Sequence, residues 1–184
     1  MFGSVKTKAL LLVPLVVLGV MAVFFALGYL VTIPLAVPLS FGFRLPVRLL
    51  GVLTLIFASS FLAWLFRYRR PVDILVSTYV TFSKMWKGAL LEKPSGRTEP
   101  LVVRGPYRYV RHPLYFGVIL LVLGWWLLLD YSFLLVSSIL LFLWFNFVVS
   151  PFEEKELKAL FGEQYKQYSE GVPRIIPLTK HLKK

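Results

Sequence analysis

The sequence predicts an all-α, polytopic membrane protein with about four transmembrane helices, an interfacial amphipathic helix and a C-terminal cytoplasmic helix. Hydrophobic residues make up 58% of the 184 residues, and the mean hydropathy is +0.73. Soluble globular domains are nearer half apolar. The apolar residues also fall into blocks that are long enough to cross a bilayer. Proline, glycine and charged residues separate these blocks, as expected for helices joined by short polar loops.

Two membrane spans are expected in the N-terminal half. Residues 9–31 form an uninterrupted apolar run, which is longer than the core of a signal peptide and is expected to be retained as a helix. Pro14 lies inside it, and membrane helices tolerate such a kink. A proline-rich turn over residues 32–43 leads into the second span, residues 45–66.

Residues 72–91 have a different pattern. Apolar and aromatic side chains recur there at helical spacing, and charged or hydroxylated side chains occupy the other faces. This pattern is typical of a helix that lies on a membrane rather than crossing it. The polar segment that follows, residues 92–100, contains strong helix breakers.

The third and fourth spans are predicted over residues 114–129 and 131–149. Only Asp130 and its neighbours separate them, so the two spans should pair as a tight antiparallel hairpin. Ser150-Pro151 is expected to end the fourth span.

A charged helix is predicted over residues 152–168, with a break at Gly162, and residues 171–177 read as extended. The chain divides into residues 1–100, the N-terminal membrane helices and interfacial helix, and residues 101–184, which hold the helical hairpin, the charged helix and the motifs considered next as a possible catalytic region.

The net charge of +12 points first to basic cytoplasmic loops over anionic lipid and only secondarily to an anionic ligand. No nucleic-acid partner is expected. The positive-inside rule places both termini, the interfacial helix and the polar motifs on the cytoplasmic side of the cell membrane. There are no cysteines and two histidines. This composition excludes disulfides, thiolate metal sites and a cysteine nucleophile, and no metal site is expected.

Arg111-His112-Pro113 begins the third span and has two interpretations. Arginine anchors helices at membrane interfaces, and proline suits a first helical turn. Alternatively, the cationic pair and the helix N-terminus together form an anion or nucleotide site. Glu153-Glu154 directly follow the fourth span, either as a solvated helix start or as a partner of the Arg-His group. Carboxylates and cations facing one another could hold a zwitterion.

Three more side chains have two interpretations each. Tyr165 and Tyr168 lie three residues apart on one helical face. They form part of either an interfacial stripe or a binding wall. Arg174 lies in the extended "VPRIIP" and is either a lipid anchor or a fixed guanidinium that binds a carboxylate.

Four features in order resemble one family: "LVVRGPYRYVRHPLYFG", an apolar hairpin, "PFEEKELKALFGEQYKQY" and "VPRIIP". Together they resemble the isoprenylcysteine carboxyl methyltransferases and their relatives, the phospholipid N-methyltransferases. The resemblance covers residues 101–177. It implies an integral membrane enzyme that uses S-adenosylmethionine, releases S-adenosylhomocysteine, and encloses the cofactor beneath a C-terminal lid at the cytoplasmic side.

The resemblance also implies roles for particular residues. Arg174 would orient an acceptor carboxylate. Glu154 is the second catalytic candidate, because with an amine acceptor either Glu154 or bulk water would have to take a proton. Tyr165, Tyr168 and Arg174 would shape the lid and the substrate side. The cofactor-binding set would be Val103, Gly105, Tyr107, Arg111, His112, Leu114, Tyr115, Glu153 and Glu154. The acceptor would be a lipophilic small molecule or a lipidated substrate that arrives through the membrane lipids.

Other functions remain open from the sequence. Membrane sterol reductases carry a similar "RHP" segment and use NADPH, although the asparagine that usually follows it is Leu114 here. A non-catalytic lipid-binding protein would keep the fold without the chemistry. Within methyl transfer, a phospholipid amine is the alternative to a carboxylate acceptor, with a proton to be removed.

Overall fold

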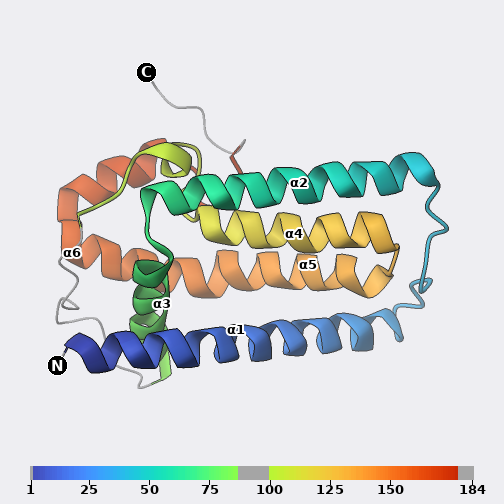
Figure 1. The fold of residues 1–184 in the computed structure, drawn as a ribbon, viewed down its shortest axis with the longest axis horizontal. Coiled ribbons are helices and arrows are strands. Elements are labelled where there is room, and N and C mark those ends of the chain that lie inside the picture. The colour runs from blue at the N-terminus through green and yellow to red at the C-terminus, as the bar shows by residue number, and fades with distance from the viewer. Residues whose placement is uncertain (1, 87–99, 178–184) are drawn as a thin grey trace.

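A computed structural model describes residues 2–86 and 100–177, and every regular element within those ranges is helical (Figure 1). The α-helices are α1 (Phe2–Thr32), α2 (Leu45–Tyr68), α3 (Pro71–Trp86), α4 (Pro113–Leu129), α5 (Ser132–Trp144) and α6 (Ser150–Gly171). A 3₁₀ turn, η1 (Gly105–Arg108), precedes α4, and a π turn, η2 (Phe145–Val149), joins α5 to α6. The prediction of an all-α membrane protein is confirmed.

Three helical stretches are long and apolar enough to cross a bilayer. They are residues 7–32, residues 45–68 and the stretch that begins at Ser132. The fourth apolar helix, α4, has 17 residues, about 25 Å at the usual rise per residue, which is the lower limit for a span. The apolar part of the last stretch ends at Val149. We therefore treat α6, which carries the charged residues, as lying outside the membrane.

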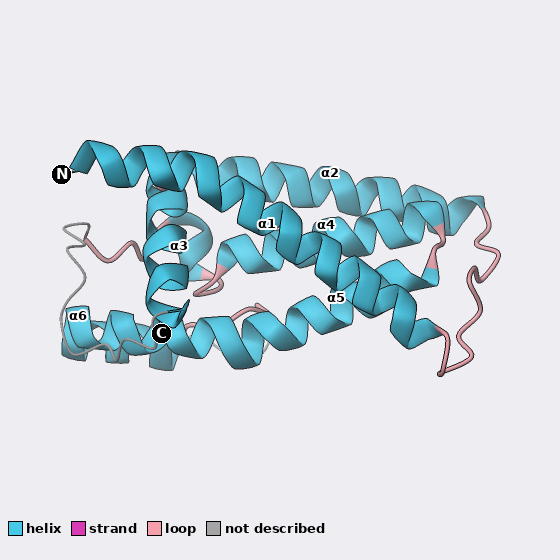
Figure 2. Cartoon of the chain, turned by 90° about the horizontal axis from the view of Figure 1, so that it is seen from below, coloured by secondary structure: helices cyan, strands magenta, loops and turns pink. Residues whose placement is uncertain are grey.

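The four apolar helices form one bundle. Helix α2 packs along α4, and α5 packs against both α1 and α4 (Figures 1 and 2). Glycine permits the close approach of α2 and α4, because a Cβ on Gly51 would lie 2.6 Å from the backbone nitrogen of Leu128. Small residues at such crossings let membrane helices pack without a hydrophobic driving force. The N-terminal and C-terminal regions are thus parts of a single helical body.

The predicted hairpin of the third and fourth spans is confirmed, and Asp130 organises its turn. Asp130 has a left-handed backbone conformation (φ 63°), which aspartate tolerates better than most residues. Its carboxylate accepts hydrogen bonds from the Ser40 hydroxyl at 2.7 Å and from the backbone amides of Phe41 and Phe43 at 3.0 and 2.8 Å. Asp130 therefore ties the loop between α1 and α2 to the turn between α4 and α5.

Helix α3 confirms the amphipathic helix as far as Trp86, and the predicted residues 87–91 lie outside the described ranges. Figures 1 and 2 show α3 lying across one end of the bundle, where it packs against α1. The start of α1 and helix α6 lie at the same end (Figure 1). This grouping agrees with the predicted side of the termini, and the orientation in the membrane stays a prediction.

The apolar run ends at Val149, directly before Ser150-Pro151 as predicted, but the helical path does not end there, because η2 continues directly into α6. Pro151 lies in the first turn of α6 and has no N–H to donate to the preceding turn. The break predicted at Gly162 is confirmed. Its φ of 51° and ψ of −125° are not helical, and α6 turns back there toward the bundle (Figure 1).

Candidate active site

Two segments that are far apart in the sequence meet at the end of the bundle near α3. The backbone N–H of Arg111 donates to the Pro173 carbonyl at 2.9 Å, and the N–H of His112 donates to the Arg174 carbonyl at 3.0 Å. Pro173 and Pro177 restrict the backbone of the second segment. The "VRHP" and "VPRIIP" segments are thereby fixed side by side, and their side chains share one environment.

Glu154 lies at the centre of this environment, in the first turns of α6. Its side chain is 6% exposed, and Arg111 Nη1 lies 3.0 Å from its Oε1 atom. Arg174 donates from Nε to Oε1 at 2.9 Å and from Nη2 to Oε2 at 3.1 Å. Burial raises the pKa of Glu154, but His112, Arg174 and Arg111 outweigh it and hold the pKa at about 2. Glu154 is therefore an ionised hub for three basic groups.

His112 lies between the two glutamates. Its Nδ1 atom is 3.2 Å from Glu153 Oε2, and its Nε2 atom is 3.3 Å from Glu154 Oε1. Burial lowers the pKa of His112, but the hydrogen bonds and negative charges of Glu153 and Glu154 together raise it above 6.5. The site therefore favours an imidazolium, which would donate from both ring nitrogens.

The π turn supplies a further anchor for Arg174. The N–H of Ser150 bonds to the Phe145 carbonyl five residues earlier, so the next bond in this register would join residue 151 to the Asn146 carbonyl. Pro151 has no N–H, and Arg174 Nη1 donates to Asn146 instead, at 3.0 Å. The "SP" sequence thus provides a backbone acceptor for the arginine.

Aromatic rings hold the histidine in place. The His112 ring stacks on Tyr115 with centroids 5.4 Å apart, and Tyr115 stacks on Phe145 at 4.3 Å. On the other side, the Tyr168 hydroxyl donates to the Tyr107 carbonyl at 2.7 Å, so α6 is fastened to the turn η1. The imidazole orientation is therefore set by ring packing as well as by ion pairs.

Tyr165 is fully buried, and its hydroxyl has no hydrogen-bond partner among the described residues. Burial and the nearby charge of Glu154 raise the pKa of Tyr165 to about 12, so the phenol is neutral at pH 7. A buried polar atom without a partner is costly unless a ligand or water satisfies it. Tyr165 is one of the residues that line the cavity, so its unpaired hydroxyl lies close to that space.

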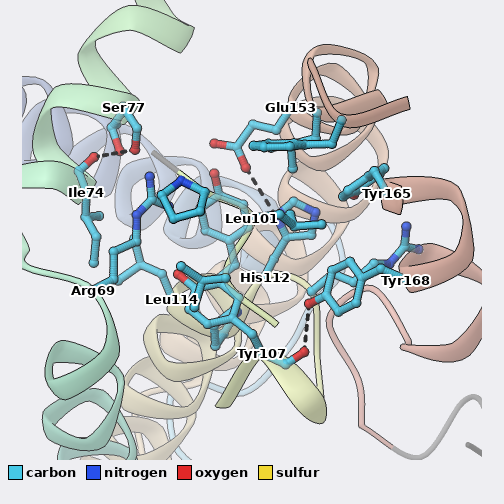
Figure 3. Close-up of a pocket in the computed structure, with 18 residues that line it drawn as sticks. Arg69, Ile74, Ser77, Leu101, Tyr107, His112, Leu114, Glu153, Tyr165 and Tyr168 are labelled. Atoms are coloured by element: carbon cyan, nitrogen blue, oxygen red, sulfur yellow. Dashed lines mark hydrogen bonds and ion pairs between the residues drawn. The ribbon is translucent and has the colours of Figure 1, made fainter. Parts of the chain in front are cut away.

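The cavity opens among α3, α6 and the segment before α4 (Figure 3). It brings together eight of the predicted site residues: Tyr107, Arg111, His112, Leu114, Tyr115, Glu153, Tyr165 and Tyr168. Figure 3 shows Glu153 and His112 facing each other at the wall. Four predicted residues are not among those that line it: Val103, Gly105, Glu154 and Arg174. Glu154 and Arg174 instead lie behind the wall and support it.

Gly105 has a structural position in this arrangement. Its φ is +61°, and a Cβ there would lie 2.5 Å from ring atoms of Tyr68. The glycine therefore lets the turn η1 approach the end of α2. Val103 is 39% exposed. The predicted cofactor contacts of Val103 and Gly105 remain predictions.

Residues 94–164 match the model of the phospholipid methyltransferase family. Over these residues the chain is similar to the phospholipid methyltransferases. The resemblance expected from the sequence is thereby confirmed, and the matched residues include the His112 and Glu153-Glu154 motifs. No solved structure matches the chain at a significant level.

Three relatives in this family carry methyltransferase names. The protein-S-isoprenylcysteine O-methyltransferase of Schizosaccharomyces pombe is 40% identical over 79 residues, 42% of this chain and 33% of the relative. The methanethiol S-methyltransferase of Crocosphaera subtropica is 37% identical over 82 residues, 42% of this chain and 30% of the relative. Protein-S-isoprenylcysteine O-methyltransferase B of Arabidopsis thaliana is 32% identical over 77 residues, with coverages of 42% and 39%. The matches span about a third of these relatives' lengths.

The residues around the cavity fit the cofactor that the resemblance implies. Glu153 brings a carboxylate to the cavity wall, which suits the ammonium of an amino acid. The orphaned hydroxyl of Tyr165 is available to a further polar group. Tyr115, Tyr168 and Phe161 supply aromatic faces, which suit a purine ring and a sulfonium.

Ten residues that line the cavity were not predicted as site residues, and four of them come from the end of α2 and from α3: Arg69, Ile74, Ser77 and Thr78. In the sequence, Arg69 belongs to the basic "RYRRP" that follows the second span. No spacing signal marked it, since the fold of α3 across the bundle end brings it to the cavity.

Proposed function

We propose that this chain is an integral membrane methyltransferase that uses S-adenosylmethionine and methylates a lipophilic acceptor, with a carboxylate as the acceptor group. The ion-pair cluster at the cavity carries the proposal. Glu153 and His112 line the cavity, and Glu154 lies behind them, so that the three groups alternate in charge in the region that matches the family. The family match also favours methyl transfer over the NADPH reductase and over a non-catalytic protein.

The cofactor supplies an electrophilic methyl group on a sulfonium and leaves as S-adenosylhomocysteine. Glu153 would bind its ammonium at the cavity wall, and His112 would hold Glu153 in place through the 3.2 Å contact. Glu154 stays ionised behind the wall and positions Arg111 and Arg174. The chain's own residues thus bind and orient, which is what an in-line displacement needs most.

A carboxylate acceptor is already a nucleophile and requires no general base. The site then has to hold the carboxylate without neutralising it and to exclude water. We propose that Arg174 acts as a positioning residue, through its contacts with Glu154 and the Asn146 carbonyl.

A second cavity supports a lipophilic acceptor. It is lined almost entirely by apolar and aromatic side chains from α2, α4 and the segments around them: Phe57, Ser60, Phe61, Trp64, Tyr109, Val110, Phe116 and Pro177. Val110 directly precedes Arg111, so the apolar cavity borders the ion-pair cluster. We propose that an acyl or isoprenoid chain reaches the acceptor site from the bilayer along this cavity.

The deciding experiment is transfer of a label. Purified protein is incubated with membrane extracts and deuteromethyl-labelled S-adenosylmethionine, and the lipid and peptide fractions are searched by mass spectrometry. We expect a lipophilic carboxylic acid to gain the label as a base-labile ester. Label on a base-stable phospholipid amine would support the second candidate, N-methylation, which the phospholipid methyltransferase model favours. If no molecule gains label from folded protein, methyl transfer is refuted.

A further inference from the structure

The cavity has a second wall that lies outside the region matched to the methyltransferase family. Arg69 follows α2, and Ile74, Ser77 and Thr78 come from α3; all precede residue 94, where the family match begins. Figure 3 shows Arg69, Ile74 and Ser77 on the side of the cavity away from Tyr165 and Tyr168. The bound molecule would therefore contact both halves of the chain.

The two walls carry different sets of charged groups. On the family wall, the carboxylate of Glu153 lies beside His112 at 3.2 Å, and the guanidinium of Arg111 is directed to the buried Glu154 at 3.0 Å. Arg174 is directed to Glu154 as well and does not line the cavity. Arg69 is the arginine that lines the cavity from the N-terminal half. The basic groups of the family wall thus lie against its glutamates, and the second wall adds a further guanidinium.

The backbone around Arg69 brings its side chain toward the cavity. Arg69 caps α2 in an extended conformation, with its N–H bonded to the Leu65 carbonyl, and α3 begins two residues later. Arg69 is half-buried, whereas Arg67 and Arg70 beside it are exposed. The turn therefore separates one guanidinium of the "RYRR" group from the two that face outward.

Hydroxyl groups accompany Arg69 on this wall. Ser77 is 8% exposed and donates to the Ile74 carbonyl at 2.9 Å, and Thr78 lines the cavity beside it. An arginine with a neighbouring hydroxyl is a typical set of donors for a carboxylate. An exposed arginine that served only as a lipid anchor would have no reason to face this cavity.

We propose that Arg69, supported by Thr78, is the carboxylate-binding group of the second wall. This inference rests on the proposed function, and the carboxylate belongs either to the amino acid end of the cofactor or to the acceptor. In both cases Arg69 is a binding residue contributed by the N-terminal half. The enzyme's recognition of its ligands would then depend on α2 and α3 as well as on the family motifs.

Binding measurements on purified protein in detergent test the inference without turnover. The variants are Arg69→Gln and Arg69→Lys, with Arg70→Gln as the matched control from the exposed neighbour. Isothermal titration uses two pairs of probes. The first pair is S-adenosylhomocysteine and its decarboxylated analogue, and the second pair is a prenylthioacetic acid and its methyl ester. Circular dichroism and the thermal unfolding midpoint verify that each variant is folded.

We expect Arg69→Gln to weaken one carboxylate probe by about tenfold to a hundredfold, the size of a lost charge-assisted hydrogen bond. The matching probe without the carboxylate should bind unchanged, Arg69→Lys should recover part of the affinity, and Arg70→Gln should bind like wild type. A loss of affinity for S-adenosylhomocysteine assigns the carboxylate to the cofactor, and a loss of affinity for the prenylthioacetic acid assigns it to the acceptor.

Two results overturn the inference. The first is unchanged binding of both carboxylate probes by folded Arg69→Gln, and the second is an equal loss on the carboxylate and neutral probes. If wild-type protein binds S-adenosylhomocysteine, either result refutes the role of the second wall alone. Wild-type protein that binds none of the four probes would contradict the proposed function as well.

Discussion

Replacing Glu154 by glutamine tests the hub of the site, because the change removes one charge and keeps the size of the side chain. In the native protein, four contacts of 2.9–3.3 Å join Glu154 to Arg111, His112 and Arg174. Removing the carboxylate leaves these basic groups close together and poorly solvated. Loss of one partner from a buried ion pair typically costs about 3–5 kcal/mol of unfolding free energy.

At about 2–4 °C per kcal/mol for a chain of this size, that cost is a fall of roughly 6–20 °C in the thermal unfolding midpoint. Tryptophan fluorescence of purified protein in detergent would follow unfolding. The control is Glu163→Gln on the same helix, because Glu163 is 66% exposed and pairs with Lys166 at 3.6 Å, which is worth about 0–1 kcal/mol. If Glu154→Gln unfolds at the midpoint of that control, the ion-pair hub does not stabilise the protein.

Three further perturbations follow from the geometry. The pKa of His112 is raised above 6.5 in the folded protein, so its stabilising charge is present below pH 6.5 and is lost as the pH rises through the raised pKa. The thermal unfolding midpoint of wild type should therefore fall over that pH interval. Parallel pH profiles of the midpoint for wild type and His112→Gln would contradict this. Gly105→Ala should lower the free energy of unfolding by about 1–2 kcal/mol because of the positive φ, and by more because of a clash with Tyr68. Gly162→Ala is the control, because Gly162 has a positive φ and open space around it. Equal losses of unfolding free energy in the two variants would exclude the clash. Asp130→Asn keeps the left-handed turn but removes the charge that three donors approach; it should lower the unfolding midpoint without changing cofactor binding, and an unchanged midpoint would show that the charge is dispensable.

Much of the helical architecture could be predicted from the sequence, because membrane spans require long apolar blocks. The hairpin at Asp130 and the break at Gly162 were also predictable, since both positions carry residues that tolerate positive φ. The continuation of the helix through Ser150-Pro151 was not. It depends on a π turn, which has no residue pattern of its own. The hydrogen bond that Pro151 cannot donate to the Asn146 carbonyl is replaced by one from Arg174, twenty-three residues after Pro151.

The sequence predicted which family residues lie at the site, but not which of them line the cavity and which support those that do. The order of the motifs indicated that His112 and the two glutamates are neighbours, and the structure brings them into contact. Which glutamate faces the cavity depends on how α6 is rotated, and the sequence does not specify that rotation. Arg69 was missed for a similar reason, because only the path of the chain after α2 brings it to the cavity.

Equilibrium binding of labelled S-adenosylmethionine to purified protein tests whether the wall at Glu153 is a cofactor site. We expect saturable binding to wild type that excess NADPH does not displace. Glu153→Gln should bind at least about tenfold more weakly, the size of one lost charge-assisted hydrogen bond, and Glu163→Gln should bind like wild type. Absence of saturable binding by folded wild type, displacement by NADPH, or equal affinity in Glu153→Gln would contradict a cofactor site at this wall.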